Sequence, residues 1–293
     1  MPKRYIGLLA LSVLFFSPTT ALAAPVKVVA TFSMVGDLVK NVGQDRVELT
    51  VLVGANGDVH AFEPTPQDGI ILSKADIIFE NGLHLEHWLD DLYASSASKA
   101  RRIVVSDDVE TLKAQGDVDP HIWHDVNNAL IMVENIRKGF GEVDPTHADY
   151  YEHNAQVYIE QLARLNYWVM EQLKDIPDEN RKLVTGHDTF AYFAARYGFQ
   201  IVGAAIESAT TEAVDPSAAQ IAALMDKIKS AKVKAVFTEN MHNPKLLQSL
   251  AQEAGVKVAP DLYTDALGPA GSDGDTYIKM IQHNVQIIAE YLK

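Results

Sequence analysis

Short apolar segments alternate with amphipathic segments along nearly the whole chain. The apolar segments are rich in β-branched side chains, which favours buried strands. Between them, apolar residues recur at steps of three and four, the spacing of one helix face. This alternation is typical of parallel sheets covered by helices on both faces, so we predict an α/β fold. The predicted strands are Val26–Phe32, Val47–Val53, Asp76–Glu80, Arg102–Val105, Lys182–Thr185, Gln200–Ala205, Lys234–Thr238 and Val256–Ala259.

One amphipathic segment, Asp144–Lys174, is longer than the others and keeps its apolar face throughout. Asp144 can cap its N-terminus, and Pro145 suits the first helical position because no hydrogen bond is lost there. A helix of this length would extend for about 45 Å, more than the width of a small domain. We therefore interpret it as a rigid helix that links two lobes; a single domain with one long core helix is the alternative.

The linking helix would divide the chain into parts of similar size. We predict two Rossmann-like parallel-sheet lobes joined by this helix, with an N-terminal lobe over 24–143, the helix over 144–174 and a C-terminal lobe over 175–293. Ligands of such lobes bind at the carboxyl ends of the strands, so the cleft between the lobes is the expected site.

The first 23 residues have the layout of a secretory signal peptide. Lys3 and Arg4 provide the basic start, Tyr5–Phe16 is an apolar run too short to span a bilayer, and Ala21-Leu22-Ala23 resembles a cleavage site. A buried helix or a membrane anchor is the alternative. The chain has no cysteine, which excludes disulfides, thiolate metal ligands and a lipid attached to a cysteine. We therefore expect an exported protein of the periplasm that is not lipid-anchored.

The net charge of −14 argues against a nucleic-acid partner, because no basic footprint is present. The acidic balance is compatible with a cationic ligand, although ordinary solubility explains it equally well.

Three of the ten histidines follow predicted strands or precede predicted helices. His60 lies in the loop after the second strand, His121 before a helix, and His187 between a strand and a helix that Asp188 is expected to cap. Asp265 follows the last strand in the same way. Two of these four residues come from each half, so facing lobes could bring them together. Three imidazoles and one carboxylate would fill the tetrahedral shell of Zn²⁺.

The remaining histidines have simpler interpretations. His147 and His153 are six residues apart on the long helix and cannot share a metal there, whereas His242 and His283 are expected at the surface or at caps. His84 and His87 are three apart; a solvated helix face is the alternative to a weak second metal site.

At the four candidate ligands the chain resembles the metal-specific solute-binding proteins of ABC importers for zinc and manganese, in their zinc-binding branch. The resemblance covers essentially the whole chain after residue 23. It implies two α/β lobes joined by one long helix, with the metal bound between them by His60, His121, His187 and Asp265. The matching motifs are Val59-His60-Ala61-Phe62-Glu63-Pro64, Asp119-Pro120-His121-Ile122-Trp123, Gly186-His187-Asp188, Phe237-Thr238-Glu239 and Tyr263-Thr264-Asp265.

The chain departs from this family in places that bear on its metal. Manganese-binding members tend to have glutamate where this chain has His187, and nitrogen ligands suit zinc better than manganese. The histidine-rich loop of many zinc-binding members is missing from Asp107–Asp119. His124 stands where the family usually has leucine, as an auxiliary ligand or a residue that points away. Glu63 and Glu239 are the candidates for hydrogen-bonding the ligand imidazoles.

The resemblance implies a carrier rather than an enzyme. A monomer would capture Zn²⁺ and deliver it to an ABC permease with its cytoplasmic ATPase, since the chain has no phosphate-binding loop of its own. The alternatives are a manganese carrier of the same family, a secreted zinc hydrolase in which Asp265 acts as a base, and a receptor for an iron chelate or an adhesin on the same scaffold.

Overall fold

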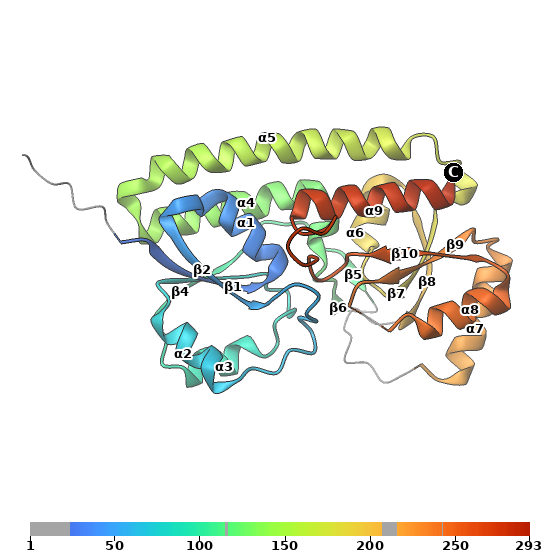
Figure 1. The fold of residues 1–293 in the computed structure, drawn as a ribbon, viewed down its shortest axis with the longest axis horizontal. Coiled ribbons are helices and arrows are strands. Elements are labelled where there is room, and N and C mark those ends of the chain that lie inside the picture. Colours follow the sequence, from blue (N-terminus) through green and yellow to red (C-terminus); the bar gives the residue numbers. More distant parts are fainter. Residues whose placement is uncertain (1–23, 115–116, 207–215, 242) are drawn as a thin grey trace, which may run out of the picture.

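A computed structural model describes residues 24–114, 117–206, 216–241 and 243–293 (Figure 1). The predicted signal peptide, residues 1–23, lies outside this part of the chain. The first half forms a four-stranded parallel sheet with strand order β2-β1-β3-β4. Its strands are β1 (Val26–Phe32), β2 (Val47–Val53), β3 (Ile77–Glu80) and β4 (Arg101–Val104).

Helices pack against both faces of this sheet, as Figure 1 shows. A capping box starts α2, where Asp68 accepts hydrogen bonds from the backbone and hydroxyl of Thr65. The side chain of Asp125 caps α4 by accepting from Asn127 N at 2.9 Å. The helical elements of this half are α1 (Ser33–Gly43), η1 (Gln44–Arg46), α2 (Pro66–Lys74), α3 (Leu89–Ser95), η2 (Ile122–His124) and α4 (Val126–Val143).

The long helix α5 (Ala148–Leu173) runs along one side of the molecule, past elements of both halves (Figure 1). It packs on α1, α4 and α9, and its 26 residues extend for about 39 Å. It starts later than predicted because Pro145–His147 forms the separate 3₁₀ turn η3. Asp144 does not cap α5; its carboxylate instead binds Tyr151 Oη at 2.8 Å.

The second half contains two parallel strand pairs, β7 with β8 and β9 with β10. Strands β7 and β9 lie next to each other, which brings the two pairs together. Its elements are η4 (Asp178–Asn180), β7 (Lys182–His187), α6 (Ala191–Tyr197), β8 (Gln200–Ile206), α7 (Ala218–Ser230), β9 (Ala235–Glu239), α8 (Lys245–Ala254), β10 (Lys257–Leu262) and α9 (Tyr277–Leu292).

The predicted cap of α6 is also wrong. Helix α6 begins at Ala191 after Phe190, so Asp188 is not its cap. Helix α3 begins at Leu89, after a turn over residues 83–88 in which Leu83 and His84 adopt left-handed backbone conformations with φ of 55° and 63°. The short hairpin of β5 (Lys113–Ala114) and β6 (Asp117–Val118) was not predicted.

The two halves share a hydrophobic core. One cluster of buried side chains runs from the first sheet through α5 to α9, and a smaller cluster fills the space between β7, β9, α7 and α8. The half-buried Asp37 of α1 accepts hydrogen bonds from Tyr277 N at 3.0 Å and Tyr158 Oη at 3.3 Å. Helix α9, at the end of the chain, is thereby held against the N-terminal half. The lobe boundaries predicted at 143 and 175 remain a prediction.

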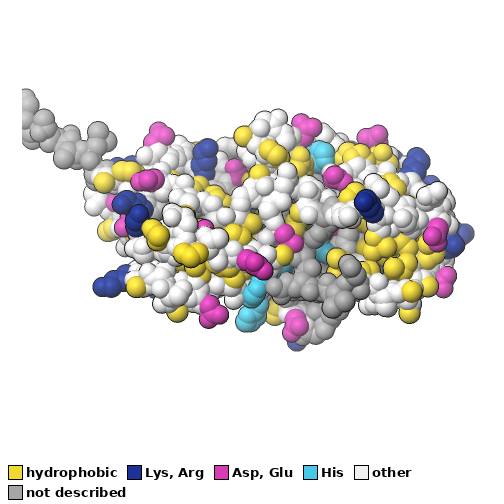
Figure 2. Space-filling view, turned by 60° about the horizontal axis from the view of Figure 1, so that its bottom comes forward, with side chains coloured by type: hydrophobic (Ala, Val, Ile, Leu, Met, Phe, Trp, Pro, Cys, Tyr) yellow, Lys and Arg dark blue, Asp and Glu magenta, His cyan; other side chains and the backbone are white. Residues whose placement is uncertain are grey.

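In the described ranges, no helix combines the length and apolarity needed to cross a membrane. Figure 2 shows Lys and Arg side chains dispersed over the visible face rather than gathered into a patch.

Candidate metal site

The structure brings His60, His121, His187 and Asp265 together. Each offers one potential ligand atom, and these atoms lie within 4.8 Å of one another. His60 sits in the turn between β2 and α2, His121 just before η2, His187 at the end of β7, and Asp265 in the loop between β10 and α9. The cluster therefore contains two residues from each half, and His187 lies at the carboxyl end of the parallel strand β7.

The facing atoms are close enough to surround a single ion. His187 Nε2 lies 3.0 Å and His60 Nε2 lies 3.3 Å from Asp265 Oδ2, and the Nε2 atoms of His60 and His121 are 3.3 Å apart. All four side chains are at most 2% exposed. Asp265 Oδ2 makes no hydrogen bond within the described residues, and its close neighbours are the Nε2 atoms of His60 and His187. A buried carboxylate oxygen without a donor costs free energy unless a cation compensates it, so the donor set suits a metal.

His60 is held by its own turn. The carboxylate of Asp58 accepts hydrogen bonds from His60 N at 2.8 Å and Ala61 N at 3.2 Å. Trp88 Nε1 donates to Val59 O at 2.9 Å, which ties this turn to the start of α3. Ala61, one residue further, is exposed, so His60 is the ligand candidate nearest the surface.

His121 is oriented by Asp119, two residues earlier. Asp119 Oδ1 lies 2.7 Å from His121 Nδ1 and also accepts from His121 N at 2.9 Å. This contact fixes the ring so that Nε2 faces the cluster. Asn81 Nδ2 donates to Pro120 O at 3.0 Å, and Tyr192 Oη donates to Asp119 O at 2.8 Å. The turn that contains Asp119 and His121 is therefore held by hydrogen bonds from side chains of both halves.

His187 is oriented by Glu239, which reaches it from the end of the neighbouring strand β9. Glu239 Oε2 lies 2.6 Å from His187 Nδ1, and Oε1 accepts from His187 N at 2.9 Å. Gly186 makes this approach possible, since a Cβ there would lie 2.7 Å from Glu239 Oε1. Of the two predicted partners, Glu239 contacts a ligand imidazole and the exposed Glu63 does not. No role was predicted for Asp119. Its position two residues before His121 could have indicated that it orients this imidazole.

The carboxylates and imidazoles control one another's protonation. Burial alone would lower the pKa of His121, but the charges of Asp265 and Asp119 outweigh it and raise that pKa to about 9. In the same way Glu239 and Asp265 raise the pKa of His187 well above its usual value. Burial would raise the pKa of Asp265, but the imidazoles of His187 and His121 hold it well below the usual range. A cation entering this site has to replace protons on His121 and His187.

His124 is not one of the clustered ligands, but it is fully buried next to them. Its Nε2 lies 3.2 Å from Thr189 Oγ1, and its ring stacks on Phe190 with centroids 4.4 Å apart. Burial, together with the positive charge of His121, lowers the pKa of His124 to about 3, so the ring is neutral.

The other histidines do not join the cluster. His84 and His87 are exposed and lie in a turn rather than on a helix face, so the basis for a shared site is wrong. His147 contacts Asp144 Oδ1 at 2.8 Å, and His153 is exposed. His283 contacts the backbone oxygen of Asp261 at 3.0 Å. His242 lies outside the described residues.

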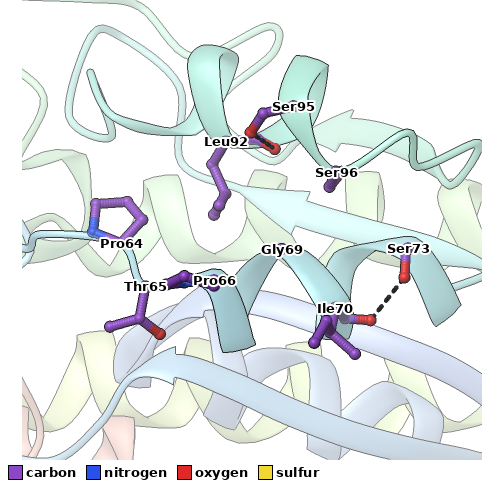
Figure 3. Close-up of a pocket in the computed structure, with 9 residues that line it drawn as sticks. All are labelled: Pro64, Thr65, Pro66, Gly69, Ile70, Ser73, Leu92, Ser95 and Ser96. Atoms are coloured by element: carbon purple, nitrogen blue, oxygen red, sulfur yellow. Dashed lines mark hydrogen bonds between the residues drawn. The ribbon is translucent and has the colours of Figure 1, made fainter.

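A separate hollow of about 560 Å³ lies between α2 and α3 (Figure 3). Figure 3 shows proline, serine, Ile70 and Leu92 side chains around it, and none of its lining residues is charged or a histidine. The hollow therefore offers no imidazole or carboxylate ligand, and none of the four clustered residues lines it.

Comparison with known proteins agrees with this geometry. Residues 28–291 match the family described as ZnuA, zinc-uptake complex component A, periplasmic. The chain is 36% identical to the manganese-binding lipoprotein MntA of Halalkalibacterium halodurans, over 88% of this chain and 86% of the relative. It is 31% identical to the manganese ABC transporter substrate-binding lipoprotein PsaA of Streptococcus pneumoniae, over 91% of this chain and 88% of the relative.

Solved structures resemble the whole arrangement. The periplasmic zinc-binding protein TroA from Treponema pallidum superimposes with a TM-score of 0.86 and 30% identity, over 92% of this chain and 99% of TroA. A manganese-bound periplasmic metal-binding protein from Candidatus Liberibacter asiaticus gives a TM-score of 0.83 and 27% identity, over 92% of this chain and all of the other. The predicted α/β fold with parallel sheets is therefore confirmed.

One prediction is corrected by these names. MntA and PsaA are lipoproteins, which contradicts the expectation of export without a lipid anchor. That expectation rested on the lack of cysteine and on the layout of residues 1–23, which are not among the described residues. The periplasmic side of the membrane agrees with the family description. The chain thus belongs to the ZnuA family of periplasmic zinc-uptake components, and it is the metal-binding component of an ABC importer.

Proposed function

We propose that this metal-binding component carries Zn²⁺, bound by His60, His121, His187 and Asp265. The observation that carries the proposal is the convergence of three imidazole nitrogens and one carboxylate within 4.8 Å in a buried site. Four such ligands complete the shell of a zinc site that needs no water. The ion is cargo, which the protein would deliver to a membrane permease driven by a cytoplasmic ATPase. We expect the carrier to act as a monomer.

Manganese is the second candidate cargo. The names of MntA and PsaA favour it, since both are described as manganese proteins. The ligand chemistry favours zinc, because Mn²⁺ prefers oxygen ligands and a higher coordination number, whereas imidazole suits Zn²⁺. Here three of the four candidate ligand atoms are nitrogen. A site can bind Zn²⁺ tightly in solution whatever its natural cargo, since affinity follows the Irving–Williams order.

The burial of the cluster argues against a zinc hydrolase and against a receptor for an iron chelate. A zinc hydrolase needs an open coordination position that its substrate can reach, and a chelate receptor needs room for the chelate. The four side chains are in mutual contact range and at most 2% exposed. Asp265 is also unsuited to the role of a base at neutral pH, because the neighbouring imidazoles hold its pKa well below the usual range.

Titration calorimetry with Zn²⁺ and with Mn²⁺ tests the assignment, combined with elemental analysis of protein purified from cells supplied with both metals. We expect one bound ion per chain, and His60→Ala, His121→Ala and His187→Ala should each lower zinc affinity about tenfold or more. His153→Ala, which removes an exposed histidine of α5, is the matched control and should bind like the parent. Unchanged affinity and stoichiometry in all three ligand variants would refute the proposed site. Retention of Mn²⁺ rather than Zn²⁺ from cells would reassign the cargo.

A further inference from the structure

A chain of two hydrogen bonds runs from His124 to the candidate ligand Asp265. His124 Nε2 lies 3.2 Å from Thr189 Oγ1, and Thr189 Oγ1 donates to Asp265 Oδ1 at 3.3 Å. All three side chains are fully buried. They come from η2, from the turn between β7 and α6, and from the loop between β10 and α9. These two hydrogen bonds therefore connect the two halves of the protein next to the cluster.

The direction of both hydrogen bonds follows from the chemistry of the groups. A hydroxyl has one proton, and Thr189 uses it towards the ionised Asp265. Its oxygen can then only accept from His124, so Nε2 of the neutral ring carries the proton. His124 Nδ1 is left without a hydrogen-bond partner in the described part of the chain. The imidazole thus keeps the Thr189 hydroxyl aimed at Asp265 Oδ1.

The two carboxylate oxygens of Asp265 therefore have different hydrogen-bond partners. Oδ1 accepts from Thr189 and lies 3.6 Å from His121 Nε2. Oδ2 lacks a donor among the described residues and lies close to both His60 and His187. The hydrogen bond draws electron density from Oδ1 and fixes the rotation of the carboxylate, which leaves Oδ2 as the better ligand atom.

We propose that His124 and Thr189 are positioning residues that hold Asp265 as a one-oxygen ligand and thereby favour a four-coordinate ion over ions that need more oxygen ligands. The inference rests on the proposed function, because it concerns selectivity at that same site. With one carboxylate oxygen and three nitrogens the shell has four members, which suits Zn²⁺. If both oxygens of Asp265 bound, the shell would have five members and more oxygen, which suits Mn²⁺ better.

The alternative is that His124 only fills space. Its ring stacks on Phe190 and lies 5.8 Å from the ring of Trp123, centroid to centroid, so its removal also disturbs packing. Leucine at position 124 would supply a similar apolar contact without a donor. Glutamine there would keep an N–H near the place of Nε2 while losing the aromatic stack. The two substitutions therefore separate hydrogen bonding from packing.

The decisive experiment compares Thr189→Val, His124→Leu and His124→Gln with the parent protein. Thr189→Val is nearly isosteric and removes only the hydroxyl. Thr238→Val is the matched control, because Thr238 is a buried threonine whose hydroxyl donates to Ala259 O instead. Competition calorimetry gives the ratio of the Mn²⁺ and Zn²⁺ dissociation constants. Absorption spectra of the Co²⁺-loaded proteins report coordination number, since the visible bands of four-coordinate Co²⁺ are strong and weaken when ligands are added.

We expect the dissociation constant of Mn²⁺ divided by that of Zn²⁺ to fall about tenfold in Thr189→Val and His124→Leu, because selectivity for Zn²⁺ is partly lost. The visible bands of Co²⁺ should be weaker in both variants. His124→Gln and Thr238→Val should keep the ratio and the bands of the parent. If Thr189→Val and His124→Leu bind Zn²⁺ with unchanged ratio and bands, the inference is wrong while the proposed function stands. A lower ratio with unchanged bands also overturns it, because coordination number is then not the cause. Failure of the parent protein to bind Zn²⁺ overturns the proposed function itself.

Discussion

His121 and His187 contribute to the same cluster from different halves, and their supports differ in kind. His121 depends on a carboxylate two residues away in its own turn, Asp119. His187 depends on Glu239, which is 52 residues away in sequence and lies on another strand. Both carboxylates hold Nδ1 and the backbone N–H of their histidine. The carboxylate that orients His121 is therefore a near neighbour in the sequence, whereas the carboxylate that orients His187 reaches it only through the tertiary structure.

The turn that carries Asp119 and His121 also accepts hydrogen bonds from residues elsewhere in the chain. Asn81 and Tyr192 both donate to the turn of His121. Asn81 is itself held by Glu86, whose Oε1 accepts from Asn81 N at 2.7 Å. Glu239 receives an additional hydrogen bond from Thr264 at 3.2 Å. Loss of Asp119 should therefore do less damage to metal binding than loss of Glu239.

The largest effect on metal binding is expected for Glu239→Gln. The amide can accept from only one of the two His187 groups that the carboxylate now binds, and its negative charge is lost. Zinc affinity should fall about 100-fold, which corresponds to about 2.7 kcal/mol. Titration calorimetry measures this change, with Glu160→Gln on the exposed face of α5 as the control. A loss smaller than that of Asp119→Asn would contradict the comparison.

A smaller effect is expected for Asp119→Asn. The amide oxygen can still accept from His121 N, and the bonds from Asn81 and Tyr192 keep the turn in place. Zinc affinity should fall about tenfold, because the orientation of the imidazole is weakened while the loop stays intact. The same calorimetric titration applies. If Asp119→Asn unfolds the turn, seen as loss of protection of its amides in hydrogen exchange, the bracing is weaker than we infer.

The smallest effect on metal affinity, and a distinct effect on stability, is expected for Glu86→Gln. Burial raises the pKa of Glu86 from 4.5 to about 7, against the hydrogen bonds from Thr31 and Asn81. A carboxyl whose folded pKa lies above its unfolded pKa stabilises the fold below the unfolded value and loses this contribution as pH rises through the folded value. The contribution should amount to about 3 kcal/mol, lost between pH 4.5 and about 7.

Urea unfolding at a series of pH values measures this contribution. The free energy of unfolding of the parent, minus that of Glu86→Gln, should decrease as pH rises across this window. A difference that stays constant with pH would show that Glu86 is ionised in the folded protein throughout.

Sequence patterns predicted the alternation of strands and helices and the long helix, and the choice of the four clustered residues also depended on the family resemblance. They succeeded at Val26–Phe32 because a buried parallel strand is a continuous apolar run, and at His60 and His187 because strand ends define one edge of a sheet. They failed at Asp188, where the chain turns before α6 starts. Helix termini depend on backbone conformations such as that of His84, which no apolar spacing encodes.

Contacts between distant segments could not be predicted in the same way. Asp119 was within reach of sequence reasoning because its target, His121, is two residues away. The pairing of Glu239 with His187 depends on strands β7 and β9 lying next to each other, which local patterns do not determine. The contact of His124 with Thr189 likewise requires both halves to be placed first.

Trp123 joins the two loops that carry His121 and Asp265. Its Nε1 donates to Thr264 O at 2.9 Å, and its carbonyl oxygen accepts from Tyr277 Oη at 2.7 Å. These two hydrogen bonds lie beside the cluster and connect the two halves of the protein. They therefore oppose a separation of the halves when a bound ion is released. The loop of His60 is also connected to the loop of Asp265, because Asn56 N donates to Leu267 O at 2.9 Å. Release of a bound ion should therefore require these loops to loosen locally rather than the two halves to separate.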